Sequence, residues 1–277
     1  MSGPGPLLAE AAARLRAAGV PSPRVDAELL LAHVLDVPRS RLLLVDVGPA
    51  ERSAYETALA RRVAREPLQH IVGWAPFRHL QVPVGPGVFV PRPETELLVD
   101  AVLPALASPE AVAVDLCSGS GALALALADE SPAARVVAVE RPGETFDLWL
   151  VPNTAGSRVE PVAADVSDPG LLTELRGRVD AVVSNPPYVP SGAPVDVEVR
   201  TDPAVAVFAG PDGLAVIPDV LARAAELLRP GGRLALEHDD THGDAVPALL
   251  RADGRWREVA AHRDLAGRPR FATAVRA

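Results

Sequence analysis

The stretch AVAVDLCSGSGALALALA, residues 111–128, combines three patterns that together decide the fold class of this chain. The run AVAVDL is apolar at consecutive positions, as expected of a strand buried on both faces of a parallel sheet. The turn CSGSG follows, and ALALALA has the composition of a buried helix. A strand, a glycine-rich turn and a helix in this order indicate a doubly wound α/β domain.

Further short apolar segments have the character of strands and mostly alternate with helical stretches. With residues 111–116, the predicted strands are 135–140, 158–163, 179–184, 233–237, 255–260 and 270–275. The first five are apolar on consecutive positions, which predicts a mainly parallel sheet. The sequence therefore predicts an α/β domain over residues 93–277.

The N-terminal quarter of the chain has a different periodicity. Apolar residues recur at helical spacing from Leu7 to Gly73, which predicts a small helical domain over residues 1–73. Arg61, Arg62 and Arg65 are expected to form a solvated face of one of its helices. Residues 74–92 alternate apolar positions with proline and glycine, which predicts a β-hairpin linking the two domains.

Composition excludes several classes of protein. The net charge of −9 and pI near 5.2 give no basic surface for gripping a phosphate backbone, so we expect no nucleic-acid partner. A single cysteine, Cys117, excludes an intramolecular disulfide and a cysteine-based zinc site. Neither a signal-peptide pattern nor an apolar run of about 18 residues is found, so we expect a cytoplasmic protein without a membrane anchor. We also expect a monomer.

The turn after the first predicted α/β strand has the properties of a cofactor loop. Gly119 and Gly121 permit positive φ and close approach of a ligand, and the following helix offers free N–H donors. With Ala124 these glycines also fit the loose dinucleotide pattern, which by itself does not decide between cofactors. Asp115 lies just before the glycines, where a carboxylate suits the sulfonium and amino acid portion of S-adenosylmethionine better than a pyrophosphate.

Three residues on neighbouring strands complete this expectation. Glu140 ends the next strand, where a carboxylate can accept both hydroxyls of a ribose. Asp165, after the third strand, is a candidate for the adenine amino group, with Val166 packing on the ring, and on sequence alone it is equally compatible with an aspartate that only forms a turn. Cys117 has no nearby histidine in sequence and is interpreted as a small buried loop residue rather than a reactive thiol.

The segment SNPPYVP, residues 184–190, follows the fourth predicted strand, at the sheet edge where open α/β folds bind ligands. The side chain of Asn185 and the carbonyl of Pro186 can accept the two hydrogens of an –NH2 group. Pro187 stiffens the loop, and Tyr188 offers a flat face for a planar amide or base. This arrangement predicts the positioning of a planar amine or amide next to a methyl donor.

Asn-Pro-Pro-Tyr resembles the motif of amino-group methyltransferases, which is shared by adenine-N6 DNA enzymes and by HemK-type enzymes that methylate a glutamine of peptide chain release factors. Other segments resemble the HemK-type family specifically. They are PLQHIVGWAPF (67–77), GVFVPRPETELLVD (87–100), FAGPDGL (208–214), LRPGGRLALEH (228–238) and DLAGRPRFATA (264–274). The resemblance covers essentially the whole chain.

The resemblance implies a helical domain that recognises the release factor and a class I methyltransferase domain whose last strand is antiparallel. The substrate would be the glutamine of a Gly-Gly-Gln loop, held by Asn185, Pro186, Pro187 and Tyr188. The residues implied to line the S-adenosylmethionine site are Phe89, Pro91, Arg92, Glu94, Asp115, Cys117, Ser118, Gly119, Ser120, Gly121, Glu140, Asp165, Val166 and Asn185. Asn185 and Pro186 would aim the amide nitrogen at the methyl group, with no general base required.

The chain also departs from the family. After Glu140 the family has a longer helix, whereas RPGETFDLWLVPN contains Pro142, Gly143 and Pro152, so we expect a short helix and an altered wall of the adenine pocket. The family often has glycine in place of Cys117.

Other functions are also compatible with parts of the pattern. A ribosomal-protein glutamine methyltransferase and a DNA adenine methyltransferase share the Asn-Pro-Pro-Tyr motif, although the acidic pI disfavours the second. An NAD-dependent oxidoreductase or a non-catalytic cofactor-binding module would explain the glycine-rich loop but not this motif. A metal cluster formed by Glu237, His238, Asp239, Asp240 and His242 is disfavoured against a solvated strand-to-helix connection, so no metal is expected.

Overall fold

The computed structural model describes residues 3–133 and 135–277, and the chain divides into two compact units. The helical unit comprises residues up to Trp74 together with the short segment 195–201. The sheet unit comprises residues 75–194 and 202–277. Segment 195–201 therefore belongs to the helical unit although it lies far along the chain.

Proline at the first position begins each of the three long helices of the helical unit, where its missing N–H leaves no bond unmade. These helices are α1 (Pro4–Ala17), α2 (Pro23–Leu35) and α3 (Pro49–Val63). The shorter elements are η1 (Arg39–Leu44), α4 (Leu68–Val72) and η6 (Val199–Thr201). The helices bury a common apolar core that includes Leu15, Leu30 and Tyr55.

The prediction of a solvated arginine face is wrong for two of its three members, since Arg65 lies just after the end of α3 with a side chain only 18% exposed and paired with Asp196 and Glu198. Arg61 is exposed and pairs with Glu66, but Arg62 is buried and its guanidinium bonds the Asp26 carboxylate at 2.7 Å. Helical periodicity indicates which positions share a face. It does not indicate whether a carboxylate from another helix covers that face.

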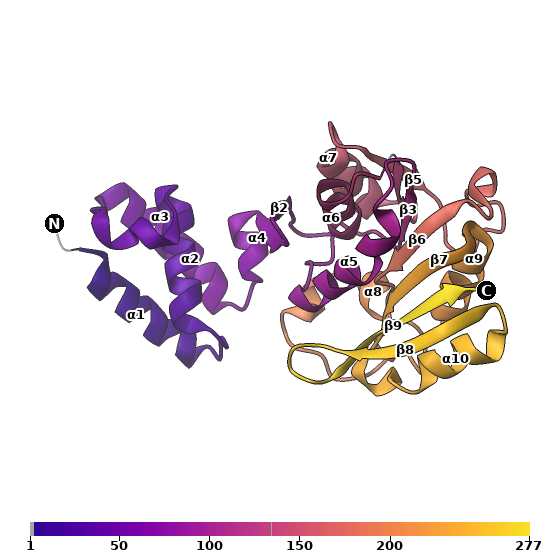
Figure 1. Ribbon diagram of the computed structural model, residues 1–277. Coiled ribbons are helices and arrows are strands. Elements are labelled where there is room, and N and C mark those ends of the chain that lie inside the picture. Colours follow the sequence, from indigo (N-terminus) through magenta and orange to yellow (C-terminus); the bar gives the residue numbers. More distant parts are fainter. Residues whose placement is uncertain (1–2, 134) are drawn as a thin grey trace. The chain divides into compact units, whose positions relative to one another are not determined.

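The sheet unit contains a seven-stranded sheet in the order β5-β4-β3-β6-β7-β9-β8, drawn in Figure 1. The strands are β3 (Val112–Leu116), β4 (Arg135–Glu140), β5 (Val159–Ala163), β6 (Val179–Ser184), β7 (Leu228–Glu237), β8 (Trp256–Arg263) and β9 (Pro269–Arg276). The five neighbouring strands β5, β4, β3, β6 and β7 pair in parallel. Strand β9 runs antiparallel to both β7 and β8. The predicted mainly parallel sheet with an antiparallel last strand is confirmed.

The two faces of this sheet carry separate apolar cores because successive side chains of a strand point to opposite faces. On β3, Val114 joins the core that contains α9 (Ile217–Leu227) and α10 (Ala245–Asp253). Ala113 joins the core that contains α5 (Glu96–Val102) and α6 (Ala122–Glu130). Burial on both faces explains the consecutive apolar residues of the parallel strands.

The remaining elements of the sheet unit are short. A separate two-stranded sheet consists of β1 (Trp74–Phe77), which begins at the last residue of the helical unit, and β2 (Leu80–Pro83). The short helices are η2 (Pro93–Thr95), η3 (Leu103–Leu106), η4 (Phe146–Leu150), α7 (Val151–Thr154), η5 (Thr173–Leu175), α8 (Ala204–Val207) and η7 (Asp240–His242). None of the helices among the described residues is both long and apolar enough to cross a membrane.

Candidate active site

The glycine-rich loop links the carboxyl end of β3 to the N-terminus of α6. Ser118 N donates to Val139 O at 3.0 Å, which ties the loop to β4, and Gly121 N donates to Ser118 O at 2.8 Å. Gly119 has φ of 56°, and open space lies where a side chain on it would project. Gly121 has φ of 85°, and a Cβ there would come within 2.9 Å of Leu150. One glycine thus leaves room for a ligand and the other permits close packing.

Asp115 lies at the end of β3 and is fully buried. Neither of its carboxylate oxygens makes a hydrogen bond of good geometry among the described residues, although the Ser118 hydroxyl and the Ala124 N–H lie close enough to affect its pKa. Burial raises its pKa to about 7, against the lowering effects of Ser118 and the Ala124 backbone. A buried carboxylate without a partner is unfavourable unless a ligand supplies a donor or a positive charge. The group therefore fits a cationic cofactor beside the glycine-rich loop.

Two further carboxylates gather around the same loop. Glu140 Oε2 accepts a hydrogen bond from Gly119 N at 2.8 Å, and burial raises the pKa of Glu140. Asp165 Oδ1 accepts from the backbone and the hydroxyl of Ser167, which lowers the pKa of Asp165. The charges of Glu140 and Asp165 act on each other. The sequence-predicted carboxylates thus lie within electrostatic reach of one another, while Val166 packs into the apolar core.

Cys117 has a backbone conformation that L-residues seldom adopt, with φ of 64°. Glycine has no such restriction, so the structure gives a physical reason for glycine at this position. Burial, together with the charges of Glu140 and Asp115, raises the pKa of the thiol. A raised pKa suppresses the thiolate, which is the reactive form, and supports a packing role for this residue.

The Asn-Pro-Pro-Tyr segment begins directly after β6, next to the cofactor loop. Ser184, the last residue of β6, donates from Oγ to Leu116 O at 2.7 Å. Asn185 Nδ2 donates to the hydroxyl of Thr95 at 3.2 Å. With its amide nitrogen engaged in this way, Asn185 presents Oδ1 as an acceptor. The Thr95 hydroxyl thereby fixes the orientation of the Asn185 amide.

Tyr188 is fixed by a residue that the sequence interpretation assigned to a solvated connection. Its hydroxyl donates to Glu237 Oε1 at 2.9 Å, and Glu237 is 1% exposed at the end of β7. Burial raises the pKa of Glu237 to about 7, while nearby Thr95 and Tyr188 and the charge of Arg270 lower it. Thr95 and Glu237 are therefore candidate site residues that the sequence analysis did not select. Both lie within segments quoted for the family resemblance, residues 87–100 and 228–238, and that was the available signal.

The predicted strand-to-helix connection joins β7 to α10, and its residues Asp240 and Thr241 are exposed, but the prediction that it is solvated is wrong for both histidines. His238 is fully buried, and His242 is 5% exposed. His238 Nδ1 lies 2.8 Å from Asp239 O, and His242 Nε2 lies 2.8 Å from Asp212 O. These imidazoles support loop carbonyls, and the described residues contain no group of three or more side chains suited to hold a metal ion.

The chain after Tyr188 is held in place by backbone contacts. Val189 N donates to Val207 O and Ala209 N donates to Val189 O, both at 2.9 Å. Gly213, in the FAGPDGL segment, has φ of 75°, and a Cβ there would come within 2.3 Å of Tyr188 O. The glycine is thus required for the close approach of this segment to the Asn-Pro-Pro-Tyr motif.

The GVFVPRPETE segment contacts Asp202, which lies in the loop that begins at the Asn-Pro-Pro-Tyr motif. The Arg92 guanidinium lies 4.9 Å from the centre of the Phe89 ring and bonds Asp202 Oδ2 at 2.7 Å. Val90 N also donates to Asp202, whose pKa is raised by burial to about 6. Pro91 lies between these residues, half-buried, and Glu94 lies 3.9 Å from Arg268.

The segment after Glu140 is helical despite Pro152. A π-helix, η4, runs directly into α7. Pro152 is the second residue of α7 and lies where the regular i to i−4 hydrogen-bond pattern of the helix is already interrupted. Asn153 Nδ2 donates to Ser120 O at 2.9 Å and to Pro83 O at 3.0 Å. The segment therefore braces the glycine-rich loop through a side chain that the sequence analysis did not select.

Known protein families match both the helical unit and the sheet unit of this chain. The family model described as "PrmC N-terminal domain" matches residues 6–73, and the one described as "Methyltransferase small domain" matches residues 81–201. The chain is 53% identical to the release factor glutamine methyltransferase of Mycolicibacterium smegmatis, covering 96% of this chain and 95% of that protein. It is 48% identical to the release factor glutamine methyltransferase of Streptomyces coelicolor, with 98% and 97% covered.

Solved structures support the same fold. The catalytic domain of hMettl16, solved in complex with the MAT2A 3'UTR hairpin 6, has a TM-score of 0.54 at 14% identity. The alignment covers 84% of this chain and 83% of that domain. At this level of identity the match supports the class I methyltransferase fold alone.

Proposed function

Because this chain belongs to the release factor glutamine methyltransferase family, we propose that it methylates the side-chain amide of the glutamine in the Gly-Gly-Gln motif of a peptide chain release factor. The observation that carries this proposal is the hydrogen bond from Asn185 Nδ2 to the hydroxyl of Thr95. It leaves Asn185 Oδ1 free to accept a hydrogen from a substrate amide.

Asn185 and Pro186 together orient the glutamine. Pro186 has no N–H, so its backbone offers a carbonyl acceptor and no competing donor. Asn185 Oδ1 and this carbonyl accept the two amide hydrogens, which keeps the nitrogen lone pair directed toward the methyl donor. Tyr188, anchored to Glu237, forms a wall against the planar amide. Positioning of this kind supplies a large part of the rate when the donor is already activated.

The residues present also fit the cofactor of this family, S-adenosylmethionine. We propose that Asp115 faces its positive charge, that Glu140 holds the ribose and that Asp165 receives the adenine amino group. The unpartnered carboxylate of Asp115 and the open space at Gly119 support this assignment. When bound, S-adenosylmethionine would supply an activated methyl group: the bond from sulfur to this methyl would break as the bond to the amide nitrogen forms, S-adenosylhomocysteine would leave, and the nitrogen would then release one proton to water.

We further propose how the parts of the chain divide the work. Residues 1–73 recognise the release factor, residues 74–92 link the domains, and residues 93–277 carry the chemistry. The remaining cofactor contacts are assigned to Phe89, Pro91, Arg92, Glu94, Cys117, Ser118, Ser120, Gly121 and Val166. The enzyme is proposed to act as a monomer in the cytoplasm, on protein rather than nucleic acid.

Transfer of a labelled methyl group tests the proposal directly. The purified chain is incubated with methyl-labelled S-adenosylmethionine and a purified release factor, and label on the protein is counted. We expect incorporation into the wild-type factor and none into a factor whose Gly-Gly-Gln glutamine is replaced by alanine. Absence of label on the wild-type factor, or equal label on both factors, would contradict the proposed substrate.

A further inference from the structure

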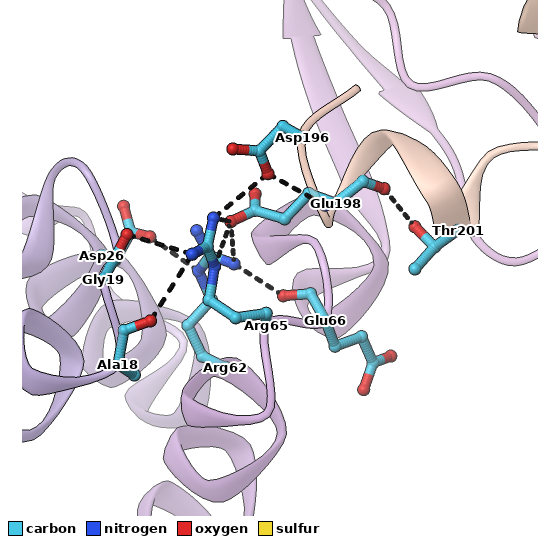
Figure 2. A network of polar contacts seen from close by, with 9 residues as sticks. All are labelled: Ala18, Gly19, Asp26, Arg62, Arg65, Glu66, Asp196, Glu198 and Thr201. Carbon is cyan, nitrogen blue, oxygen red and sulfur yellow. Dashed lines mark hydrogen bonds and ion pairs between the residues drawn. The ribbon is translucent and has the colours of Figure 1, made fainter. Parts of the chain in front are cut away.

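Segment 195–201 belongs to the helical unit, although it continues the loop that begins at the Asn-Pro-Pro-Tyr motif. Figure 2 shows the polar network that holds it, in which Arg62 and Arg65 meet Asp196 and Glu198. The chain therefore passes between the units at 74/75, 194/195 and 201/202. The second and third crossings lie within one loop of the proposed glutamine site.

Arg62 provides the buried anchor of this network. Its side chain is 4% exposed and bonds Asp26 Oδ2 at 2.7 Å. A second nitrogen of the same guanidinium lies 2.9 Å from Glu198 Oε1 and 2.9 Å from the carbonyl of Glu66. A buried guanidinium with charged partners on two sides is strongly held, because removing one partner leaves the other charge buried and uncompensated.

Arg65 adds a second anchor in a strained backbone conformation. Its φ is 66°, just after the end of α3, where glycine is the usual residue. The side chain bonds Glu198 Oε1 at 2.8 Å, Asp196 Oδ1 at 3.1 Å and the carbonyl of Gly19 at 3.1 Å. Backbone strain of this kind persists where surrounding contacts require it and directs attention to a role for the side chain.

The captured segment is itself ordered by local bonds. Glu198 N donates to Asp196 Oδ1 at 2.9 Å, and the hydroxyl of Thr201 donates to Glu198 O at 2.6 Å. Both flanks are fixed on the sheet unit, at Val189 by its backbone pairing and at Asp202 by Arg92. Asp202 directly follows the captured segment. A displacement of Glu198 would therefore reach the Asp202–Arg92 ion pair through only a few backbone bonds.

Resting on the proposed function, we propose that Arg62, Arg65 and Glu198 are positioning residues for glutamine methylation. By holding segment 195–201, the helical unit keeps the loop after Asn-Pro-Pro-Tyr in the shape that places Asn185 and Tyr188. The helical unit then acts on the chemical step as well as on recognition of the release factor.

Two variants break the network without stranding the buried Arg62–Asp26 pair. Arg65→Gly removes one anchor and places the favoured residue at a positive φ, so the end of α3 is relieved of strain. Glu198→Gln keeps the shape of the side chain but removes its charge. Arg61→Ala serves as the matched control, because the exposed Arg61 lies on α3 and its guanidinium pairs with Glu66 rather than with segment 195–201.

Steady-state kinetics with the release factor separate positioning from docking. For Arg65→Gly and Glu198→Gln we expect kcat to fall about tenfold, while KM for the release factor and the Kd for S-adenosylmethionine stay within about twofold. The double variant should lose no more than either single variant, since both remove one coupled interaction. An unchanged kcat, or a rise in KM alone, would overturn the proposal. Failure of the wild-type enzyme to methylate the factor would instead overturn the proposed function.

Limited proteolysis gives a second readout that needs no substrate. Arg200 is exposed within the captured segment, and the chain contains no lysine, so trypsin cleaves only after arginine. Release of the segment should accelerate cleavage after Arg200 in Arg65→Gly and Glu198→Gln by at least about fivefold, because proteolysis follows local opening. Arg61→Ala should be cleaved there at the wild-type rate. Equal cleavage of all four proteins would contradict the network's role in holding the loop.

Discussion

The two halves of the proposed active site differ in how their buried polar side chains are partnered. In the glutamine half, Asn185 bonds Thr95, and Tyr188 bonds Glu237. In the cofactor half, both oxygens of Asp115 are buried without a hydrogen-bond partner among the residues the structure describes. A partnered side chain is fixed in orientation, whereas an unpartnered charge has affinity for a ligand. Changes in the glutamine half should therefore alter rate, and changes in the cofactor half should alter affinity.

The largest expected effect comes from replacing one of the chain's two asparagines. Asn185→Ala removes the acceptor that orients the substrate amide and should lower kcat on the order of 100- to 1000-fold, as loss of a preorganised polar group does elsewhere. Binding of S-adenosylmethionine, measured by calorimetry, should change by no more than a few fold. Equal losses in kcat and in cofactor affinity would show that Asn185 has a structural role.

The other asparagine is the natural control for this comparison. Asn153→Ala removes the bonds to Ser120 O and Pro83 O that brace the glycine-rich loop. It should weaken cofactor binding while leaving kcat at saturating cofactor within about threefold. If Asn185→Ala lowers mainly kcat and Asn153→Ala lowers mainly cofactor affinity, the two halves contribute independently to catalysis. Similar losses of both quantities in both variants would contradict this.

The second effect concerns the unpartnered carboxylate. Asp115→Asn should weaken binding of S-adenosylmethionine by about 10- to 100-fold at pH 8, since a charged interaction in a buried site is lost. With a ligand-free pKa of about 7, wild-type affinity should rise by up to about fivefold from pH 6 to pH 7 and by up to about tenfold from pH 6 to pH 8, and then level off. The variant should show no such rise. Calorimetric titrations across this range, with the exposed Asp168→Asn as control, measure it.

The same carboxyl predicts an opposite trend in the stability of the ligand-free protein. Its folded pKa lies above the usual value of 3.8, so the folded state binds more protons between about pH 4 and pH 7. The contribution of Asp115 to the free energy of unfolding is therefore greatest below about pH 4 and falls as pH rises to 7. Denaturant unfolding of wild type and Asp115→Asn should diverge in the variant's favour over that window.

A smaller effect is expected from the hydroxyl that orients Asn185. Thr95→Val keeps the shape of the side chain but removes the acceptor at 3.2 Å from Asn185 Nδ2, and should lower kcat by about 5- to 20-fold. Thr95→Ser keeps the hydroxyl and should remain within about twofold of wild type. Similar rates for the two variants would mean that packing, rather than the hydroxyl, is what matters at this position.

The smallest effect is expected at Cys117. Cys117→Gly relieves a left-handed conformation, while the added freedom of glycine in the unfolded chain offsets part of the gain. The net change in the free energy of unfolding should be a gain of no more than about 1 kcal/mol, with kcat unchanged. A loss greater than this in denaturant titration would show that packing of the thiol outweighs the backbone strain.

The sequence predicts those features of this molecule that depend on local pattern. The strands, the glycine-rich turn and the position of Asn185 at a strand end follow from burial on both faces and from the residues of the turn. The partners of the site side chains do not follow, because Thr95 lies 90 residues from Asn185, and Glu237 lies 49 residues from Tyr188. Arg62 shows the same limit, since only the fold brings Asp26 to cover it.

Strand β9 has a consequence for the order in which the chain becomes an enzyme. It lies between β7 and β8 although it is synthesised after both, and it pairs Phe271 with Glu237. Arg270 on the same strand supplies the positive charge that acts on Glu237, the anchor of Tyr188. A nascent chain that has not yet inserted β9 has two incompletely paired strands and an unsupported glutamine site. The proposed glutamine site is thus completed only once β9 has inserted between β7 and β8, and so later in synthesis than the glycine-rich loop.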